Sequence, residues 1–209
     1  MAIVATMYSD AEGQLAVRMA RDAIDAYTRG RAIPPFSVPS TFQRESGCFV
    51  TINTYPGDAL RGCIGYPSPY FPLAKAIVKA AEGATEDPRF PKLAPDELDH
   101  VVVEVSVLTP PELLEARKPK ALAQQVRVGV DGLIAARGRD RGLLLPQVPV
   151  DQGWDATEFL SQTCVKAGLL PDAWLEPDTR MYRFQSEIWT EVVPRGEIVR
   201  RTLTSDADS

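Results

Sequence analysis

The stretch HVVVEVSVL, residues 100–108, is the clearest strand pattern in the chain. Successive side chains of a strand point to opposite faces, so the valines at 101, 103, 105 and 107 share one face, which we expect to be buried. The opposite face carries Glu104 beside Ser106. An unpaired buried charge is too costly to persist, so this carboxylate must lie on an open sheet face or beside a cation. In the second case Glu104 is a candidate general base.

A hairpin is predicted before this strand. Residues 47–54 are rich in β-branched and aromatic side chains, and the turn Tyr55-Pro56-Gly57-Asp58 leads into a returning strand over 59–65. Capping patterns and the helical spacing of apolar residues predict three helices, over about 9–30, 73–85 and 155–167.

The second half of the chain is predicted to contain a β-rich unit over 126–148. Its strands are expected at 126–130, 133–136 and 142–148, with a hairpin turn at Asp131-Gly132. A final strand is expected over 181–192. Antiparallel hairpins with helices between them indicate an α+β fold.

The composition excludes several classes of protein. The chain has 209 residues, 23 Lys and Arg against 28 Asp and Glu, one histidine and three cysteines. Three distant cysteines argue against a secreted disulfide framework, and a single histidine argues against metal sites built on histidine pairs, so we expect no metal and no other cofactor. No signal peptide is visible, and no apolar run reaches the ~18 residues of a membrane span. With a net charge of −5, we expect a cytoplasmic protein that binds neither nucleic acid nor membrane.

The most unusual segment is Leu60-Arg61-Gly62-Cys63-Ile64-Gly65, because two glycines interrupt a predicted strand. Glycine inside a strand marks a bulge or a place where another backbone or a ligand comes close. In a regular strand Arg61 and Cys63 share a face, and a guanidinium beside a thiol lowers its pKa, as a nucleophilic or redox cysteine requires. The simpler alternative is that Cys63 is a small buried side chain beside a bulge.

Other candidates have weaker support from their context. In the loop Asp87-Pro88-Arg89-Phe90, Arg89 either binds an anion or makes a structural contact with Asp87. Lys166 either reaches a neighbouring cleft or is a solvated lysine near a helix C-terminus. Cys164 lies on the apolar face of its helix and is expected to belong to the core, and nothing in the sequence brings His100 to Cys63.

Several segments together resemble the AMMECR-type domain family, named after the chromosomal region for Alport syndrome, intellectual disability, midface hypoplasia and elliptocytosis. The hexapeptide 60–65 is the hallmark of that family and is present without a change. The other matching segments, in the family's order, are GCFVT (47–51), DPRF (87–90), EVSVL (104–108), GVDGL (129–133), LLPQV (144–148), and FL (159–160) with CVKAGL (164–169).

The resemblance implies two lobes within one domain over residues 1–193. The larger lobe, with an antiparallel sheet flanked by helices, is expected to take about 1–119 and 151–193, and the smaller β-rich lobe about 120–150. A mobile tail is expected over 194–209. The family's hexapeptide lies near a cleft between the lobes, where ligand pockets tend to form. The site residues expected there are Cys63 and Glu104 as catalytic groups, and Arg61, Gly62, Arg89, Ser106, Gln147 and Lys166 as ligand-binding groups.

The family's activity is not established, so two functions follow from the resemblance. The first is a site for a small molecule or a peptide in the cleft, with a cysteine-dependent reaction if Cys63 acts as a nucleophile or redox thiol. The second is a non-catalytic interaction module that works with a Memo-type protein or a radical S-adenosylmethionine protein. In either case we expect a monomer or a dimer. A transcriptional or RNA-binding role is disfavoured by the acidic balance.

Overall fold

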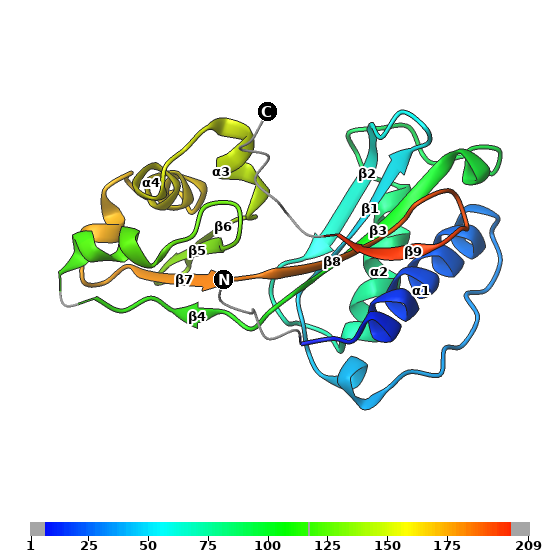
Figure 1. The fold of residues 1–209 in the computed structure, drawn as a ribbon, viewed down its shortest axis with the longest axis horizontal. Coiled ribbons are helices and arrows are strands. Elements are labelled where there is room, and N and C mark those ends of the chain that lie inside the picture. The colour runs from blue at the N-terminus through cyan, green and yellow to red at the C-terminus, as the bar shows by residue number, and fades with distance from the viewer. Residues whose placement is uncertain (1–6, 117, 202–209) are drawn as a thin grey trace. The chain divides into compact units, whose positions relative to one another are not determined.

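The computed structural model describes residues 7–116 and 118–201. Of these, 7–108 and 187–201 form one compact unit, and 109–116 with 118–186 form the second. Each unit contains an antiparallel sheet packed on helices, which confirms the predicted α+β class (Figure 1).

The first unit has a five-stranded sheet in the order β2-β1-β3-β8-β9, with helices α1 and α2 on one face (Figure 1). The elements are α1 (Asp10–Thr28), β1 (Cys48–Thr54), β2 (Leu60–Tyr66), α2 (Leu73–Thr85), β3 (Val101–Leu108), β8 (Ser186–Glu191) and β9 (Ile198–Arg201), with short 3₁₀ helices at Ser40–Gln43 and Leu98–His100. The buried valines of β3 join residues of α1, α2 and β1 in a single core, as their spacing predicted.

Local sequence explains where these elements begin. Ser9 and Glu12 form the expected capping box at the start of α1: the Ser9 hydroxyl accepts from the Glu12 amide, and the Glu12 carboxylate accepts from the Ser9 amide. At the contact between α1 and β8, a Cβ on Gly13 would lie 1.9 Å from the Trp189 ring, so only glycine fits there.

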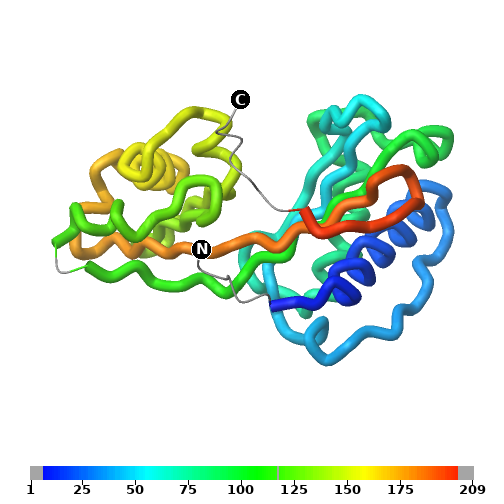
Figure 2. Tube along the Cα trace, viewed as in Figure 1, coloured from blue at the N-terminus to red at the C-terminus, as the bar shows by residue number. Residues whose placement is uncertain are grey.

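The C-terminal part of the chain completes the first sheet. β8 lies between β3 and β9, so segments about 80 residues apart in sequence are neighbours (Figure 2). The predicted single strand over 181–192 is two strands in two different sheets, with Gln185 between them. The tail predicted over 194–209 is corrected over part of its length: residues 198–201 form β9 and pair with β8, while 202–209 lie outside the described residues.

The second unit has a four-stranded sheet in the order β4-β7-β5-β6. Its elements are β4 (Glu112–Leu113), β5 (Gly132–Arg137), β6 (Asp140–Leu144), α3 (Gln147–Gln152), α4 (Ala156–Lys166) and β7 (Arg180–Phe184), with 3₁₀ helices at Pro119–Gln125 and Ala173–Leu175. Helix α4 packs on β5 and β6, and Phe159, Leu160 and Cys164 contribute its buried face.

The structure of the second unit differs from three of the expectations drawn from the sequence. Residues 126–130 form no strand, and the hairpin turn lies at Gly138 between β5 and β6 rather than at Asp131-Gly132. Asp131 is fully buried and accepts hydrogen bonds from Arg127 and Gln185, so it organises a loop instead. The unit also extends beyond the expected 120–150 at both ends, because β4, β7 and α4 share its sheet and core.

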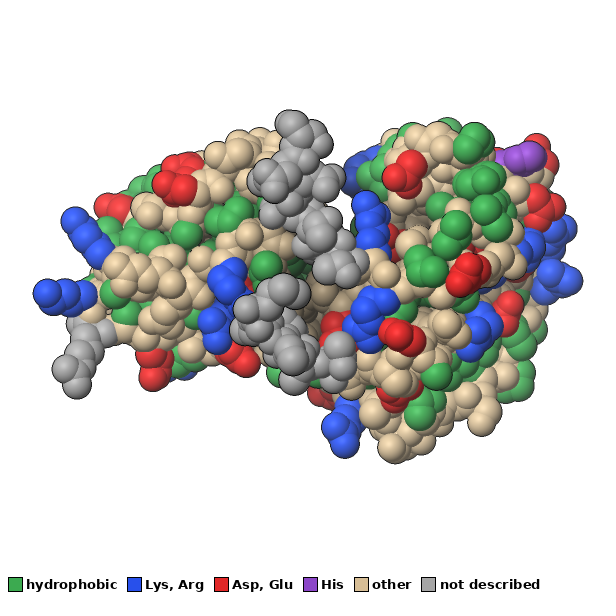
Figure 3. Space-filling model, in the orientation of Figure 1, with side chains coloured by type: hydrophobic (Ala, Val, Ile, Leu, Met, Phe, Trp, Pro, Cys, Tyr) green, Lys and Arg blue, Asp and Glu red, His purple; other side chains and the backbone are tan. Residues whose placement is uncertain are grey.

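The surface mixes charges of both signs. On the face drawn in Figure 3, acidic and basic side chains are interspersed over the described residues of each unit. Within the described ranges, no helix has both the length and the apolar character that crossing a membrane requires.

Candidate functional site

Two of the candidate residues, Cys63 and Glu104, lie with Thr51 on the sheet face opposite α1 and α2, which we call the outer face. In the strand register Thr51 of β1 lies opposite Cys63 of β2 on one side and opposite Glu104 of β3 on the other. Directly paired residues project to the same side of a sheet, so the three form a cross-strand row. Strands are spaced ~4.8 Å apart, which puts Cys63 and Glu104 about 10 Å from each other with Thr51 between them.

The Cys63 thiol is half-buried and hydrogen-bonded. The Thr51 hydroxyl donates to Cys63 Sγ at 3.3 Å. Burial raises the pKa of the thiol, and the Thr51 hydrogen bond and the Arg89 guanidinium offset this only in part. Cys63 is therefore a protonated thiol at neutral pH, unlike the thiolate that an adjacent guanidinium was expected to produce.

Glu104 is partly buried beside a cation, which is the second of the two settings that the sequence allowed. Its side chain is 12% exposed, and its Oε2 accepts from Arg201 Nη1 at 3.0 Å. Burial raises the pKa of the carboxyl group, Arg201 lowers it, and Asp58 raises it further. Arg201 was missed by sequence reasoning, because it lies in the segment expected to be a mobile tail.

Arg61 does not act on Cys63 as expected. The register between β1 and β2 shifts at Ile52 and Asn53, which makes Arg61 the extra residue of a β-bulge. Its Nε donates to Glu97 Oε1 at 2.7 Å, and its Nη1 donates to the carbonyl oxygen of Pro91. The guanidinium that lowers the Cys63 pKa is instead that of Arg89.

Gly62 is required by packing against a helix. A Cβ at this position would lie 2.2 Å from the carbonyl oxygen of Ala84, near the end of α2. The close approach that the glycine predicted is therefore made by a helix backbone.

The Asp87-Pro88-Arg89 loop covers the outer edge of β2 beside Cys63. Asp87 Oδ2 accepts from the Cys63 amide at 2.8 Å, and Arg89 Nη2 donates to the Cys63 carbonyl oxygen at 3.3 Å. Asp87 is 2% exposed, and its hydrogen bonds with Arg89 hold its pKa well below the usual range. The loop thus satisfies one residue of a sheet edge as a neighbouring strand would.

The sequence indicates Asp87 only as a structural partner of Arg89, because spacing along the chain does not show that its carboxylate accepts from the Cys63 amide of β2. The contact between these two residues, one of the two alternatives left open, is present. The Arg89 side chain nevertheless remains 55% exposed, so it can also face a ligand.

The remaining candidates fall into two groups. Ser106 is buried on the outer face, one step along β3 from Glu104. Gln147, at the start of α3, and Lys166, in the last turn of α4, belong to the second unit, and their part in a site stays a prediction.

The other two cysteines are fully buried. Burial raises the pKa of Cys48 to about 12 and that of Cys164 to about 11. Both are packing residues, as their patterns indicated.

A pocket of about 270 Å³ continues the outer face toward the end of the sheet. It is lined by Thr54, Asp58, Val102, Thr190 and Arg201 among others. Arg201 therefore belongs both to this pocket and to the ion pair with Glu104. The arrangement offers a thiol, hydroxyls, a carboxylate and a guanidinium on one sheet face, which suits recognition of a small polar molecule.

Comparisons with known proteins place the chain among uncharacterised relatives. The model of the AMMECR1 family matches residues 17–189. Protein MJ0810 of Methanocaldococcus jannaschii is 50% identical over 92% of this chain and 96% of its own length, and a protein of Thermococcus gammatolerans is 54% identical over 93% and 97%. The crystal structure of uncharacterised protein PH0010 from Pyrococcus horikoshii matches with a TM-score of 0.82 and 51% identity, over 93% of this chain and 98% of that one.

Proposed function

The chain belongs to the AMMECR1 family, and from that premise we propose that it binds a small molecule or a peptide on the outer face of the first unit's sheet. The observation that carries the proposal is the cross-strand row, in which Thr51 pairs in register with Cys63 and with Glu104. A cytoplasmic location stays a prediction, and so does an extension of this site to Gln147 and Lys166.

Three features support a binding role at this row. The side chains of Cys63, Thr51 and Glu104 are all partly exposed, so each can reach a ligand. Arg201 and Arg89 bring positive charge to the two ends of the row, where they can hold an anionic group. The pocket beside Arg201 adds a concave surface.

The protonation state of Cys63 favours binding over thiolate chemistry. A thiol with a raised pKa has a small thiolate fraction at neutral pH, and Glu104 lies two strands away rather than in hydrogen-bonding reach. We therefore assign Cys63 as a polar contact for the ligand. A cysteine-dependent reaction is the rival, and it requires the bound ligand itself to lower the pKa of Cys63.

Ligand protection of Cys63 tests the proposal. The native protein is alkylated with iodoacetamide in the presence of pools of small molecules and short peptides, and modification of each cysteine is followed by mass spectrometry. A ligand of the row should slow alkylation of Cys63, and the protection should weaken in Glu104→Gln and Thr51→Val. Lys75→Gln, an exposed change on α2, is the matched control and should leave the protection unchanged.

Two results would count against the binding site. Protection that persists unchanged in both row variants would place the ligand elsewhere. Failure of Cys63 to react until the protein unfolds would mean that the row is closed to ligands.

The interaction module is retained as a second candidate because of exposed apolar side chains at the ends of β2. Tyr70 is 69% exposed, and Leu60 and Tyr55 are 41% and 40% exposed. Tyr55 and Leu60 lie at the start of β2 and Tyr70 lies beyond its end, so each end presents an exposed apolar group that a partner protein could cover. Co-elution with a Memo-type protein in size-exclusion chromatography, lost in a Tyr70→Ser and Leu60→Ser variant, is the expected result. Separate elution of the two wild-type proteins would reject this candidate.

A further inference from the structure

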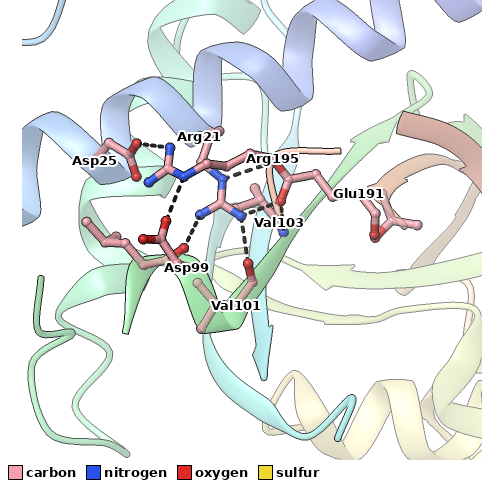
Figure 4. Close-up of polar contacts among 9 residues, drawn as sticks. Arg21, Asp25, Asp99, Val101, Val103, Glu191 and Arg195 are labelled. Carbon is pink, nitrogen blue, oxygen red and sulfur yellow. Dashed lines mark hydrogen bonds and ion pairs between the residues drawn. The ribbon is translucent and has the colours of Figure 1, made fainter. Parts of the chain in front are cut away.

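A buried ion pair lies on the helix side of the same sheet. Arg21 of α1 and Glu191 of β8 are bonded to each other, with side chains that are 5% and 3% exposed (Figure 4). Arg21 also donates to the carbonyl oxygens of Leu98 and Val101, and Glu191 accepts from the Val103 amide at 3.0 Å. Every polar atom of the two side chains already has a hydrogen-bond partner within the protein. The pair therefore stabilises the fold and is not available to bind a ligand.

A second cluster fixes the turn that follows β8. Arg195, in the turn between β8 and β9, binds both Asp25 of α1 and Asp99 of the 3₁₀ helix Leu98–His100 (Figure 4). These two carboxylates raise the pKa of Arg195. Both ion pairs of the Arg195 guanidinium are therefore made within the protein, and the one with Asp25 fixes the turn to α1.

Between α1 and this turn lies a cavity of about 430 Å³, which we call the α1 cavity. Its volume is in the range of ligand pockets. Its wall includes Arg18 and Asp22 of α1 and Glu197 of the turn, and none of the three has an ion-pair partner among residues 7–116 and 118–201. Once the committed pairs are set aside, one positive and two negative groups remain free to bind a ligand.

We propose that the α1 cavity binds a basic α-amino acid, a molecule with one carboxylate and two cationic groups. Its α-carboxylate would pair with Arg18, and its two ammonium groups with Asp22 and Glu197, so that each uncommitted charge gains a partner. The apolar chain between the ammonium groups would lie along Ile198, which also lines the cavity.

The electrostatic setting of Asp22 agrees with a cationic partner. Its pKa is raised, first by burial and then by neighbouring Asp25, while the arginines around it lower the pKa by less. A cation at this place would relieve the unfavourable ionisation of Asp22. The α1 cavity lies on the sheet face opposite the cross-strand row, so this inference is independent of the proposed function.

Isothermal titration with four probes tests the ligand class. L-Lysine carries all three charges, L-norleucine lacks the side-chain ammonium, 1,5-diaminopentane lacks the carboxylate, and hexanoate lacks both ammonium groups. We expect L-lysine to bind with a dissociation constant below ~1 mM and at least about tenfold more tightly than any other probe. Equal binding of L-lysine and 1,5-diaminopentane, or no heat from L-lysine at ~10 mM, would overturn the proposal.

Variants locate the binding. Arg18→Gln, Asp22→Asn and Glu197→Gln should each weaken L-lysine binding about tenfold or more, because each removes one charged partner. Arg29→Gln changes an exposed arginine at the end of the same helix, outside the cavity wall, and should leave the affinity unchanged. All four side chains are at the surface, so circular dichroism should report an unchanged fold. Binding that survives all three cavity changes would contradict the assignment.

Discussion

At Gly62 the backbone of β2 packs directly against the end of α2, with no space for a side chain. In Gly62→Ala, the added Cβ would lie 2.2 Å from the Ala84 carbonyl oxygen, so the helix end must move. We expect the free energy of unfolding in urea to fall by about 1–3 kcal/mol. Gly57→Ala is the matched control, since its new Cβ would meet only the Thr54 hydroxyl at 3.3 Å. Equal losses in the two variants would contradict this account of Gly62.

Asp87 should make stability depend on pH in a defined direction. Its pKa in the folded protein lies below the usual 3.8, so its ionised form stabilises the fold above that pH and the benefit disappears as pH falls through the folded pKa. Asp87→Asn should therefore cost about 1–3 kcal/mol at pH 7, because bonds to Arg89 and the Cys63 amide are weakened. Urea titrations at several pH values should show the difference shrinking below pH ~4. A difference that is constant from pH 7 to pH 3 would refute this role.

At this scale the sequence identified Cys63 but not its neighbours. The two glycines drew attention to the hexapeptide because glycine destabilises a strand and is therefore unusual inside one. Thr51 and Arg201 carry no such mark, and they reach Cys63 and Glu104 only through strand pairing. The bulge that turns Arg61 toward Glu97 likewise depends on the register, which spacing alone does not fix.

The turn between β8 and β9 combines backbone strain with ion pairs. Arg195 has φ 59°, a left-handed conformation that costs a non-glycine residue roughly 1–2 kcal/mol. Arg195→Ala should be the least stable form, since it keeps the strain and loses the bonds to Asp25 and Asp99. Arg195→Gly should recover about 1 kcal/mol of that loss by removing the strain. Thermal unfolding that ranks alanine equal to or above glycine would disprove this explanation.

Elements with strong local signals were predicted well, and elements made by pairing were not. The capping boxes and apolar spacing gave α1, α2 and α4 nearly to the residue, and the valine run gave β3. By contrast β9 has only four residues, and it forms a strand because β8 offers an edge to pair with. The expected strand over 142–148 ends at Leu144, and α3 follows at Gln147.

At the scale of the whole molecule, each unit has a core of its own. Phe159 is fully buried in the second core and Ile77 in the first. Phe159→Ala should cost roughly 3–5 kcal/mol and speed amide hydrogen exchange within 109–186, while Ile77→Ala should act within 7–108 and 187–201. Exchange measured by mass spectrometry should show these opposite patterns. Uniform acceleration over the chain in both variants would mean that the two units unfold as one.

The α+β class followed from sequence because hairpins and helices alternate without β-α-β regularity. The boundaries of the two units did not follow from the sequence. A strand of two residues such as β4 has no sequence pattern of its own, and the pairing of β7 with β4 and β5 is decided by tertiary contacts. The ordered segments that resemble the family were a stronger guide to the fold than any single element.

The accessibility and acidity of Cys63 test the central claim most directly, because the outer-face site requires a reachable, protonated thiol. Iodoacetamide alkylation of the native protein, followed for all three cysteines from pH 6 to pH 10, provides its own internal controls. We expect Cys63 to react with an apparent pKa above the ordinary 9.0, while the fully buried Cys48 and Cys164 stay protected. If Cys63 reacts as slowly as those two cysteines, or titrates well below ~8.5, the account of a neutral thiol in an open site is wrong.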